Sequence, residues 1–228
     1  MGKLSCPQVA RVRITGRIEE VYPFAGIEES LRKSQRAIEL TPSADDPYSV
    51  YCGFWGSLAM LTVGNLRQAR VLAKANLTLA ERAHRGQMLA AVLWSNQLTA
   101  QITGDWTAAC NFSNRGQEIW PMDPRFLGSR ALVEYQLGSF SQGQSYMNQL
   151  VETMHSAGFG PSIEHAAVAI TVALITQITG MAEELRIAKA VAETILSSSS
   201  ATPLLALIAR AGLAFLSVEQ GDAAAAMQ

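Results

Sequence analysis

The feature of this sequence that most restricts its fold is a turn-like glycine that recurs at nearly constant intervals. These positions are Gly26, Gly64, Gly104, Gly138, Gly180 and Gly221. Successive glycines are separated by 38, 40, 34, 42 and 41 residues. Each glycine follows an apolar segment, and the segment after it has apolar residues at helical spacing, as in LRQARVLAKANL from Leu66 to Leu77. A repeat of this length is typical of arrays of helix pairs in which a glycine closes each hairpin.

The residue after the glycine supports the same interpretation. Four of the six glycines are followed by Asn65, Asp105, Ser139 or Asp222, and such side chains cap the N-terminus of a helix. In the stretch ITGDWTAAC, the carboxylate of Asp105 is therefore explained as a helix cap, without catalysis. We expect Trp106 to pack in the core at the same corner.

Apolar periodicity predicts ten helices, and no run alternates as a β-strand does. The predicted helices span 26–40, 48–63, 66–82, 86–102, 106–119, 125–137, 140–156, 162–179, 182–197 and 203–220. The sequence thus predicts an all-α fold, a solenoid of antiparallel helix hairpins with about five repeats and a truncated sixth. Residues 26–228 are expected to form this single domain, after an irregular or helical lead at 1–25.

These corners resemble the tetratricopeptide repeat, in which a glycine, an aromatic residue, an alanine and a proline recur in a fixed register. Gly104, Trp106, Ala109 and Pro121 match that register. Two further corners match in part, namely those with Gly64 and Ala69 and with Gly138 and Phe140, where Gly143 replaces the alanine. We expect these residues and Gly221 to have structural roles at the repeat corners.

Four of the five intervals exceed the usual period of that family. The looser repeat is similar to the helical regions of MalT-like or LuxR-type ATPase regulators and of bacterial proteins with class III adenylate or guanylate cyclase domains. The resemblance implies a non-catalytic, protein-binding or sensing arm of a signalling or transcriptional regulator. The alternatives are a free-standing adaptor and, less favoured, a helical enzyme of unrecognised type.

Composition narrows the classes of partner. The net charge is −1 and charged residues make up 16% of the chain, which does not indicate direct nucleic-acid binding. Cys6, Cys52 and Cys110 are too few and too scattered for a disulfide framework, and no secretory signal is evident, so a cytoplasmic location is expected. The most apolar segments, 166–178 and 203–218, are predicted to be core helices and not membrane spans.

The sequence contains no phosphate-binding GxxxxGK[ST] loop, no GxGxxG after a strand and no GxSxG elbow. His155, Glu164 and His165 form the one candidate cluster for acid–base or metal chemistry. Their spacing matches no known motif, and solvated helix-end residues are the favoured interpretation. We therefore expect no enzyme activity, no metal and no cofactor.

Recognition by a concave surface is the strongest functional inference, since stacked helix pairs form extended grooves. The expected partner is a protein, a peptide, or an adjacent ATPase, cyclase or DNA-binding domain of a parent chain. Candidate contacts on the first helix of each pair are Tyr51, Trp55, Trp94, Gln97, Arg130, Glu134 and His165. For Trp55 and Trp94 core packing is equally plausible, and Arg130 and Glu134 are spaced to pair with each other.

The last corner adds a separate expectation. After Gly221-Asp222 only six residues remain, too few for the second helix of a pair. Each unit of a helical repeat relies on its neighbour to cover its apolar face. We therefore expect this sequence to be a fragment of a longer chain.

Overall fold

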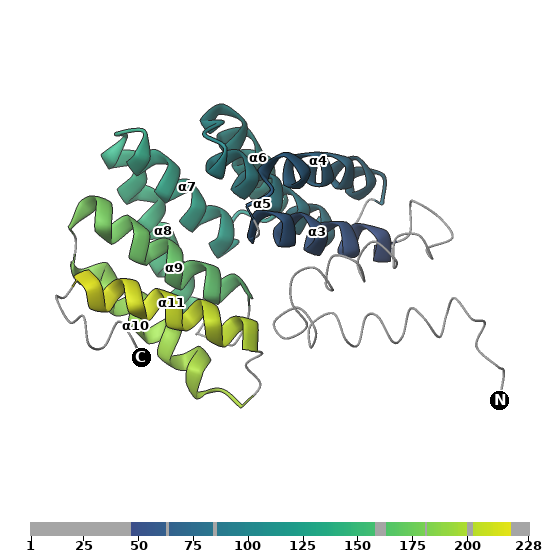
Figure 1. Ribbon diagram of the computed structural model, residues 1–228. Coiled ribbons are helices and arrows are strands. Elements are labelled where there is room, and N and C mark those ends of the chain that lie inside the picture. The colour runs from purple at the N-terminus through teal and green to yellow at the C-terminus, as the bar shows by residue number, and fades with distance from the viewer. Residues whose placement is uncertain are drawn as a thin grey trace. The chain divides into compact units, whose positions relative to one another are not determined.

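The computed structural model describes residues 47–62, 64–83, 86–157, 163–180, 182–199 and 203–219. In this part of the chain all regular structure is α-helical, so the predicted all-α class is confirmed. The helices are α3 (Pro47–Thr62), α4 (Leu66–Arg82), α5 (Gly86–Ile102), α6 (Trp106–Ile119), α7 (Pro124–Gln136), α8 (Phe140–Ala157), α9 (Ile163–Thr179), α10 (Ala182–Ser197) and α11 (Pro203–Glu219) (Figure 1). Each lies within one residue of its prediction. The predicted helix at 26–40, the lead at 1–25 and the corners at Gly26 and Gly221 lie outside the described residues.

Contacts divide the chain into two compact units, Met1–Ile119 and Trp120–Gln228. The described helices of the first unit are α3 to α6, and those of the second are α7 to α11. Within each unit the two helices of a hairpin pack against each other, and the first helices of successive hairpins are also in contact. Both units are therefore built from the same helix-pair element.

Three hairpin corners share one set of backbone hydrogen bonds. Gly64, Gly104 and Gly138 have φ values of 74°, 75° and 80°, in the left-handed region that glycine adopts without a steric penalty. The N–H of each glycine donates to the oxygen three residues earlier, and the next N–H donates to the oxygen five residues before it, at 2.8–3.1 Å. This pair of bonds is the Schellman motif, which satisfies carbonyls at the end of the first helix.

The Gly180 corner ends its helix differently. Its φ is 69°, but its N–H donates at 2.7 Å to the oxygen of Thr176, four residues earlier. A bond of this span is the one found in the simpler left-handed cap. The next residue, Met181, lies outside the described residues.

Contacts across the helices show that each hairpin is antiparallel. A Cβ at Gly53 of α3 would meet Asn76 of α4, whereas one at Gly56 would meet Leu72, so residue numbers rise on one helix as they fall on the other. In the second unit a Cβ at Gly143 of α8 would lie 3.0 Å from the Tyr135 ring of α7. That ring explains why glycine replaces the alanine expected at this position.

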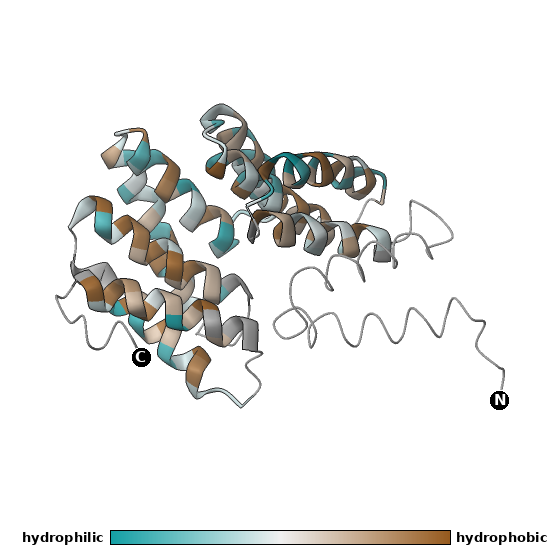
Figure 2. Ribbon diagram, viewed as in Figure 1, coloured by the Kyte–Doolittle hydropathy of each residue, from teal (hydrophilic) through white to brown (hydrophobic). Residues whose placement is uncertain are grey.

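First helices of the second unit stack in parallel. Gly128 of α7 lies opposite Thr171 of α9, and Gly212 of α11 lies opposite Ala169 of α9, so each contact joins residues 43 positions apart. Figure 1 shows α9 and α11 side by side. Their surfaces are largely apolar (Figure 2), as expected for helices covered on several sides.

The core of the second unit runs through this stack and includes Leu127, Leu150, Val172, Ile175 and Ile195, none of which has measurable exposure. The prediction that 166–178 is a core helix is thus confirmed for α9, while α11 keeps Phe215 and Val218 exposed. Among the helices that the structure describes, none combines the length and apolar character needed to span a membrane.

Replacing Gly104 by alanine is expected to lower the free energy of unfolding by about 1–2 kcal/mol, the cost of a Cβ in the left-handed conformation. No heavy atom lies within 4 Å of the added Cβ, so the loss is conformational and not a clash. Urea denaturation measures it. Gly104→Asn is the matched control and should lose less, because asparagine tolerates this region. Equal stability of Gly104→Ala and the native chain would contradict this account of the corner.

Gly143→Ala tests the packing of α8 against α7. Alanine favours a helix over glycine by about 1 kcal/mol, but overpacking typically costs about 1–3 kcal/mol. Tyr135 cannot yield easily, because it is buried and its hydroxyl donates to Gln144 Oε1 at 2.9 Å. We expect Gly143→Ala to destabilise the native chain but to stabilise a Tyr135→Leu variant, as measured by urea denaturation. A gain in both backgrounds would contradict the clash.

Candidate functional site

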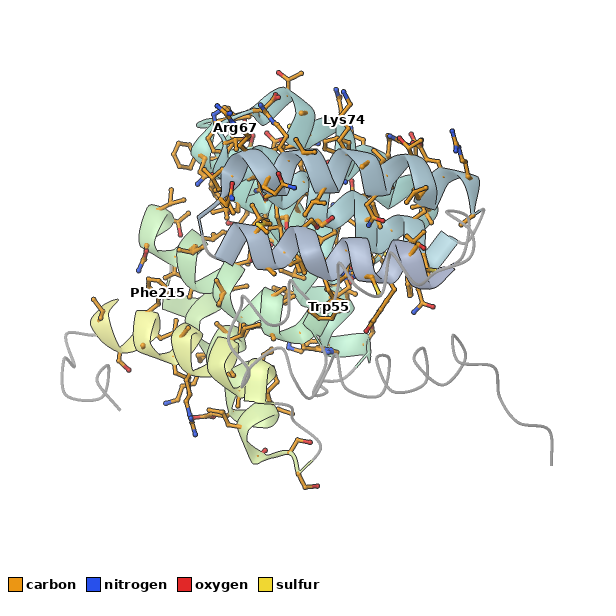
Figure 3. All side chains as sticks on the ribbon, turned by 45° about the vertical axis from the view of Figure 1, so that its right-hand side comes forward. Trp55, Arg67, Lys74 and Phe215 are labelled. Carbon is orange, nitrogen blue, oxygen red and sulfur yellow. The ribbon has the colours of Figure 1, made fainter. Side chains whose placement is uncertain are left out.

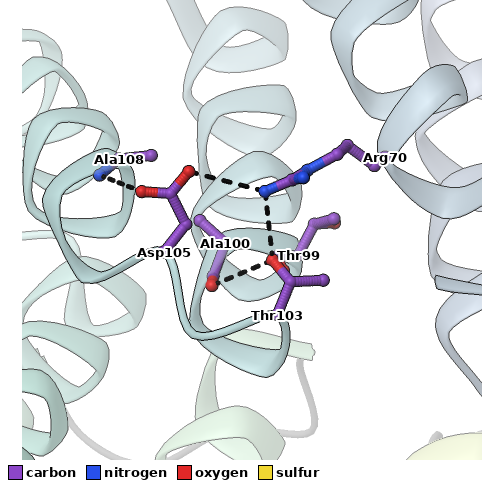
Figure 4. Close-up of polar contacts among 6 residues, drawn as sticks. All are labelled: Arg70, Thr99, Ala100, Thr103, Asp105 and Ala108. Carbon is purple, nitrogen blue, oxygen red and sulfur yellow. Dashed lines mark hydrogen bonds and ion pairs between the residues drawn. The ribbon is translucent and has the colours of Figure 1, made fainter. Parts of the chain in front are cut away.

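The Gly104-Asp105-Trp106 corner is held together by polar contacts within the first unit (Figure 4). Asp105 Oδ1 accepts the backbone N–H of Ala108 at 3.1 Å, which caps α6, and its Oδ2 accepts Arg70 Nη2 of α4 at 3.4 Å. The same Arg70 nitrogen donates to Thr103 Oγ1 at 3.5 Å, and Thr103 donates to the Thr99 oxygen at 2.8 Å. The carboxylate of Asp105 therefore has the capping role expected of it and also joins α6 to α4.

A second ion pair, between Arg115 of α6 and Glu81 of α4, lies near the other end of these helices. The paired residues are 35 positions apart for Arg70 and Asp105 and 34 for Glu81 and Arg115, so α4 and α6 run in the same direction. The four side chains are 42–58% exposed, and pairs of this kind contribute up to about 1 kcal/mol each. The two ion pairs therefore contribute little to the stability of the fold, and their main effect is on the register of α4 against α6.

The other corner residues occupy the structural places predicted for them, with two exceptions. Asn65 Oδ1 accepts the Gln68 N–H at 3.2 Å as a cap, and Ala109 is completely buried. Trp106, predicted to lie in the core, is only partly buried. Phe140 is 56% exposed and contacts the Tyr135 ring at a centroid distance of 6.0 Å. Both aromatics stand at the open end of a hairpin, where solvent reaches one side of the ring.

Two of the candidate contact residues in the predicted groove are buried. Trp94 is 5% exposed and Gln97 is fully buried, so neither is available to a partner at the surface. Both side chains lie in the core of the first unit, which is the alternative that the sequence left open for Trp94. The reason is that α5 packs against α3, α4 and α6 at once.

Tyr51 and Trp55, also predicted to contact a partner, are partly exposed on α3. Their rings meet edge to face at 6.0 Å, and Trp55 also packs edge to face on Phe54 at 5.2 Å. Phe54 in turn lies 6.4 Å from Trp94, which links α3 to α5. These two aromatics thus combine a packing role with a partly open surface.

Arg130 and Glu134, the charged candidate contact residues of the second unit, form an ion pair with each other. Arg130 Nε donates to Glu134 Oε1 at 2.7 Å, and the Arg130 guanidinium lies 5.5 Å from the centre of the Tyr146 ring. Both side chains are largely buried, so their charges are used within the fold. The mutual pairing anticipated from their spacing accounts for them.

The histidine cluster has no counterpart among the described groups. His155 is exposed in the last turn of α8, and His165 is partly buried near the start of α9. Within the described ranges, no three His, Cys, Asp or Glu side chains are arranged to hold a metal ion. The side chain of Glu164, the third member of the predicted cluster, lies outside the described residues.

Buried polar side chains form a group that sequence reasoning did not identify. Asn76, Gln97 and Ser113 are at most 2% exposed, and their side-chain polar atoms make no hydrogen bond with any residue that the structure describes. Asn96 provides a contrast, since its Nδ2 donates to the Ala73 oxygen at 3.0 Å and to the Val92 oxygen at 2.9 Å. A buried polar group without a partner lowers stability. The only sequence signal was a polar residue at a buried helical position.

Two exposed surfaces remain available for binding. The first, which we call the α4 face, consists of Arg67, Arg70, Val71 and Lys74 on α4, all of them exposed. The spacing of three, four and seven residues places these side chains on one side of the helix. The sequence analysis missed this surface because exposure of a single helix face depends on its neighbours.

The second surface, the apolar corner edge, lies in the second unit where α7, α9 and α11 end. Its residues are Leu137, Phe140, Ile178, Phe215 and Val218, each between 39% and 59% exposed. Parallel stacking of the three helices brings their C-terminal ends to one edge of the unit. Exposed apolar residues that gather in this way mark interaction sites more often than isolated ones do.

No family model and no curated protein matches this chain in sequence. Among solved structures the chain is similar to BtubC (BKLC) from P. vanneervenii, with a TM-score of 0.55 and 15% identity over 94% of this chain and 87% of that one. A likeness at this identity concerns the fold alone. It supports the all-α fold of this chain.

Gln97→Met is expected to raise the free energy of unfolding by about 1 kcal/mol, because it removes a buried amide without hydrogen bonds and keeps a similar volume. The matched control is Asn96→Met on the same helix, which should be destabilising because it breaks the bond to Ala73. Urea denaturation of both variants gives the comparison. A loss of stability in Gln97→Met would mean that this amide has a polar partner in solution.

Proposed function

We propose that this chain is a non-catalytic helical-repeat module that binds another protein, and that it serves as the sensing or scaffolding arm of a bacterial signalling or transcriptional regulator. The observation that carries the proposal is the apolar corner edge, with five large apolar side chains exposed at the ends of stacked helices. Burying such a surface provides most of the favourable free energy in protein association.

The location of this edge suits a protein partner better than a small molecule. Small-molecule sites are concave and enclose most of the ligand, whereas the edge residues stand on helix ends and on a hairpin corner. Helical repeats present extended surfaces that match the length of a polypeptide. A free-standing adaptor would use the same surface, and an open reading frame that continues into an ATPase, cyclase or DNA-binding domain would favour the regulator arm.

A photocrosslinking amino acid at Leu137 or Val218 tests this proposal in extracts of the source organism. We expect one defined protein to be crosslinked from both edge positions and not from Glu152, an exposed residue of α8 that serves as the control. Adding Phe140→Ser and Ile178→Ser should reduce the adduct formed from Leu137 by about tenfold, since apolar contacts at the centre of an interface dominate binding. These exposed sites should change stability by only about 0.5 kcal/mol each.

Equal crosslinking from the edge and from Glu152 would contradict the proposal. An adduct yield that is unchanged by the two serine substitutions would also contradict it. Either result would mean that the exposed apolar residues do not form an interface.

A further inference from the structure

We propose that the α4 face is a second docking surface, and that it takes an acidic helix of a partner protein with an apolar side chain among its carboxylates. The inference rests on the proposed function only in assuming a protein partner, because it concerns a different unit and different residues. Its basis is the charge of Arg67, Arg70 and Lys74, together with the exposure of Val71 between them.

The cations of this face are free to meet an external anion. Figure 3 shows Arg67 and Lys74 on the side of α4 that faces away from α3. Neither residue makes an ion pair with any residue in the described part of the chain. Arg70 has one contact with Asp105, at 3.4 Å, and stays 58% exposed. The described residues therefore leave the charges of Arg67 and Lys74, and much of the charge of Arg70, uncompensated.

This arrangement disfavours the isolated helix. Arg70 lies three residues from Arg67 and four from Lys74, and like charges at these spacings repel by about 0.2–0.5 kcal/mol. A solvated helix usually places acidic residues at such positions, but here the neighbouring sites hold Val71 and Thr78. The cluster is locally unfavourable for the helix, and an anionic partner would relieve the repulsion between its charges.

The chemistry of the face defines its partner. Arginine guanidinium groups match carboxylates with two parallel hydrogen bonds, and the lysine adds a point charge at the other end. Arg67 and Lys74 are seven residues apart, about 10 Å along the helix, which equals two turns of a partner helix. Val71 is 56% exposed and offers an apolar contact between the charges. An acidic amphipathic helix satisfies both requirements.

The same features argue against a nucleic acid or a membrane surface. Nucleic-acid-binding domains are usually strongly basic, whereas this chain has a net charge of −1 and a pI of about 6.3. An exposed valine at the centre has no partner on a phosphate backbone, but it has one on an amphipathic helix.

Fluorescence anisotropy with the full chain tests the inference. The probe is a labelled, alanine-based synthetic helix with three glutamates at the spacing of the α4 cations and one leucine among them. Three comparison probes are the same peptide with lysines in place of glutamates, a short DNA duplex, and vesicles that contain phosphatidylserine. We expect the acidic helix to bind, to weaken as salt is added, and to bind more tightly than the other three.

Arg67→Glu combined with Lys74→Glu should weaken binding of the acidic helix by about tenfold or more. The matched control, Lys189→Glu with Arg210→Glu, makes the same change in net charge on exposed residues of the second unit and should keep native affinity. Val71→Ser should weaken binding several-fold at high salt, where the apolar contact remains. Urea denaturation should show the α4 variant to be at least as stable as the native chain, because the like-charge repulsion is gone.

Three results would overturn the inference. They are an equal loss of affinity in the control variant, tighter binding of the duplex or the vesicles that depends on Arg67 and Lys74, and no binding of the acidic helix by the native chain. Crosslinking from the apolar corner edge uses other residues, so it reports separately on the proposed function. Failure of one experiment thus leaves the other intact.

Discussion

Each hairpin corner that the structure describes depends on a backbone that turns through the left-handed region at one glycine. The corners at Gly64, Gly104 and Gly138 use the same two hydrogen bonds to end the first helix. At each of them a third bond, from the N–H five residues after the glycine to the oxygen one residue after it, begins the second helix at 2.9 Å. The direction of the second helix is therefore set locally, before any packing between hairpins.

Small residues then decide how closely the two helices approach. Ala69 and Ala109 are completely buried five residues after their glycines, and Gly143 occupies the equivalent place at the third corner. The volume lost from alanine to glycine is taken by the Tyr135 ring. A departure from the repeat pattern is in this way compensated by a neighbour on the facing helix, as close packing in protein interiors requires.

The two surfaces that we propose for binding are left open by the hairpins and do not lie on the inner faces of the first helices. Packing of α5 against three neighbours buries Trp94 and Gln97, and mutual pairing occupies Arg130 and Glu134. By contrast, the apolar corner edge and the α4 face are exposed, although apolar side chains in water and neighbouring like charges both lower the stability of the folded chain. The two surfaces also differ in chemistry, since one is apolar and the other cationic, so they suit different parts of a partner or different partners.

The helices and the corners could be predicted from the amino-acid sequence, because glycine, capping residues and apolar periodicity act within a few residues of each other. Thus the bounds of α4, α5, α6 and α10 follow from local pattern, as does the capping role of Asp105. Only the tertiary structure decided which side of each helix is covered. Exposure of Val71, burial of Gln97 and the pairing of Arg70 with Asp105 depend on residues that are distant in sequence, and a helical pattern shows which residues share a face but not what packs against it.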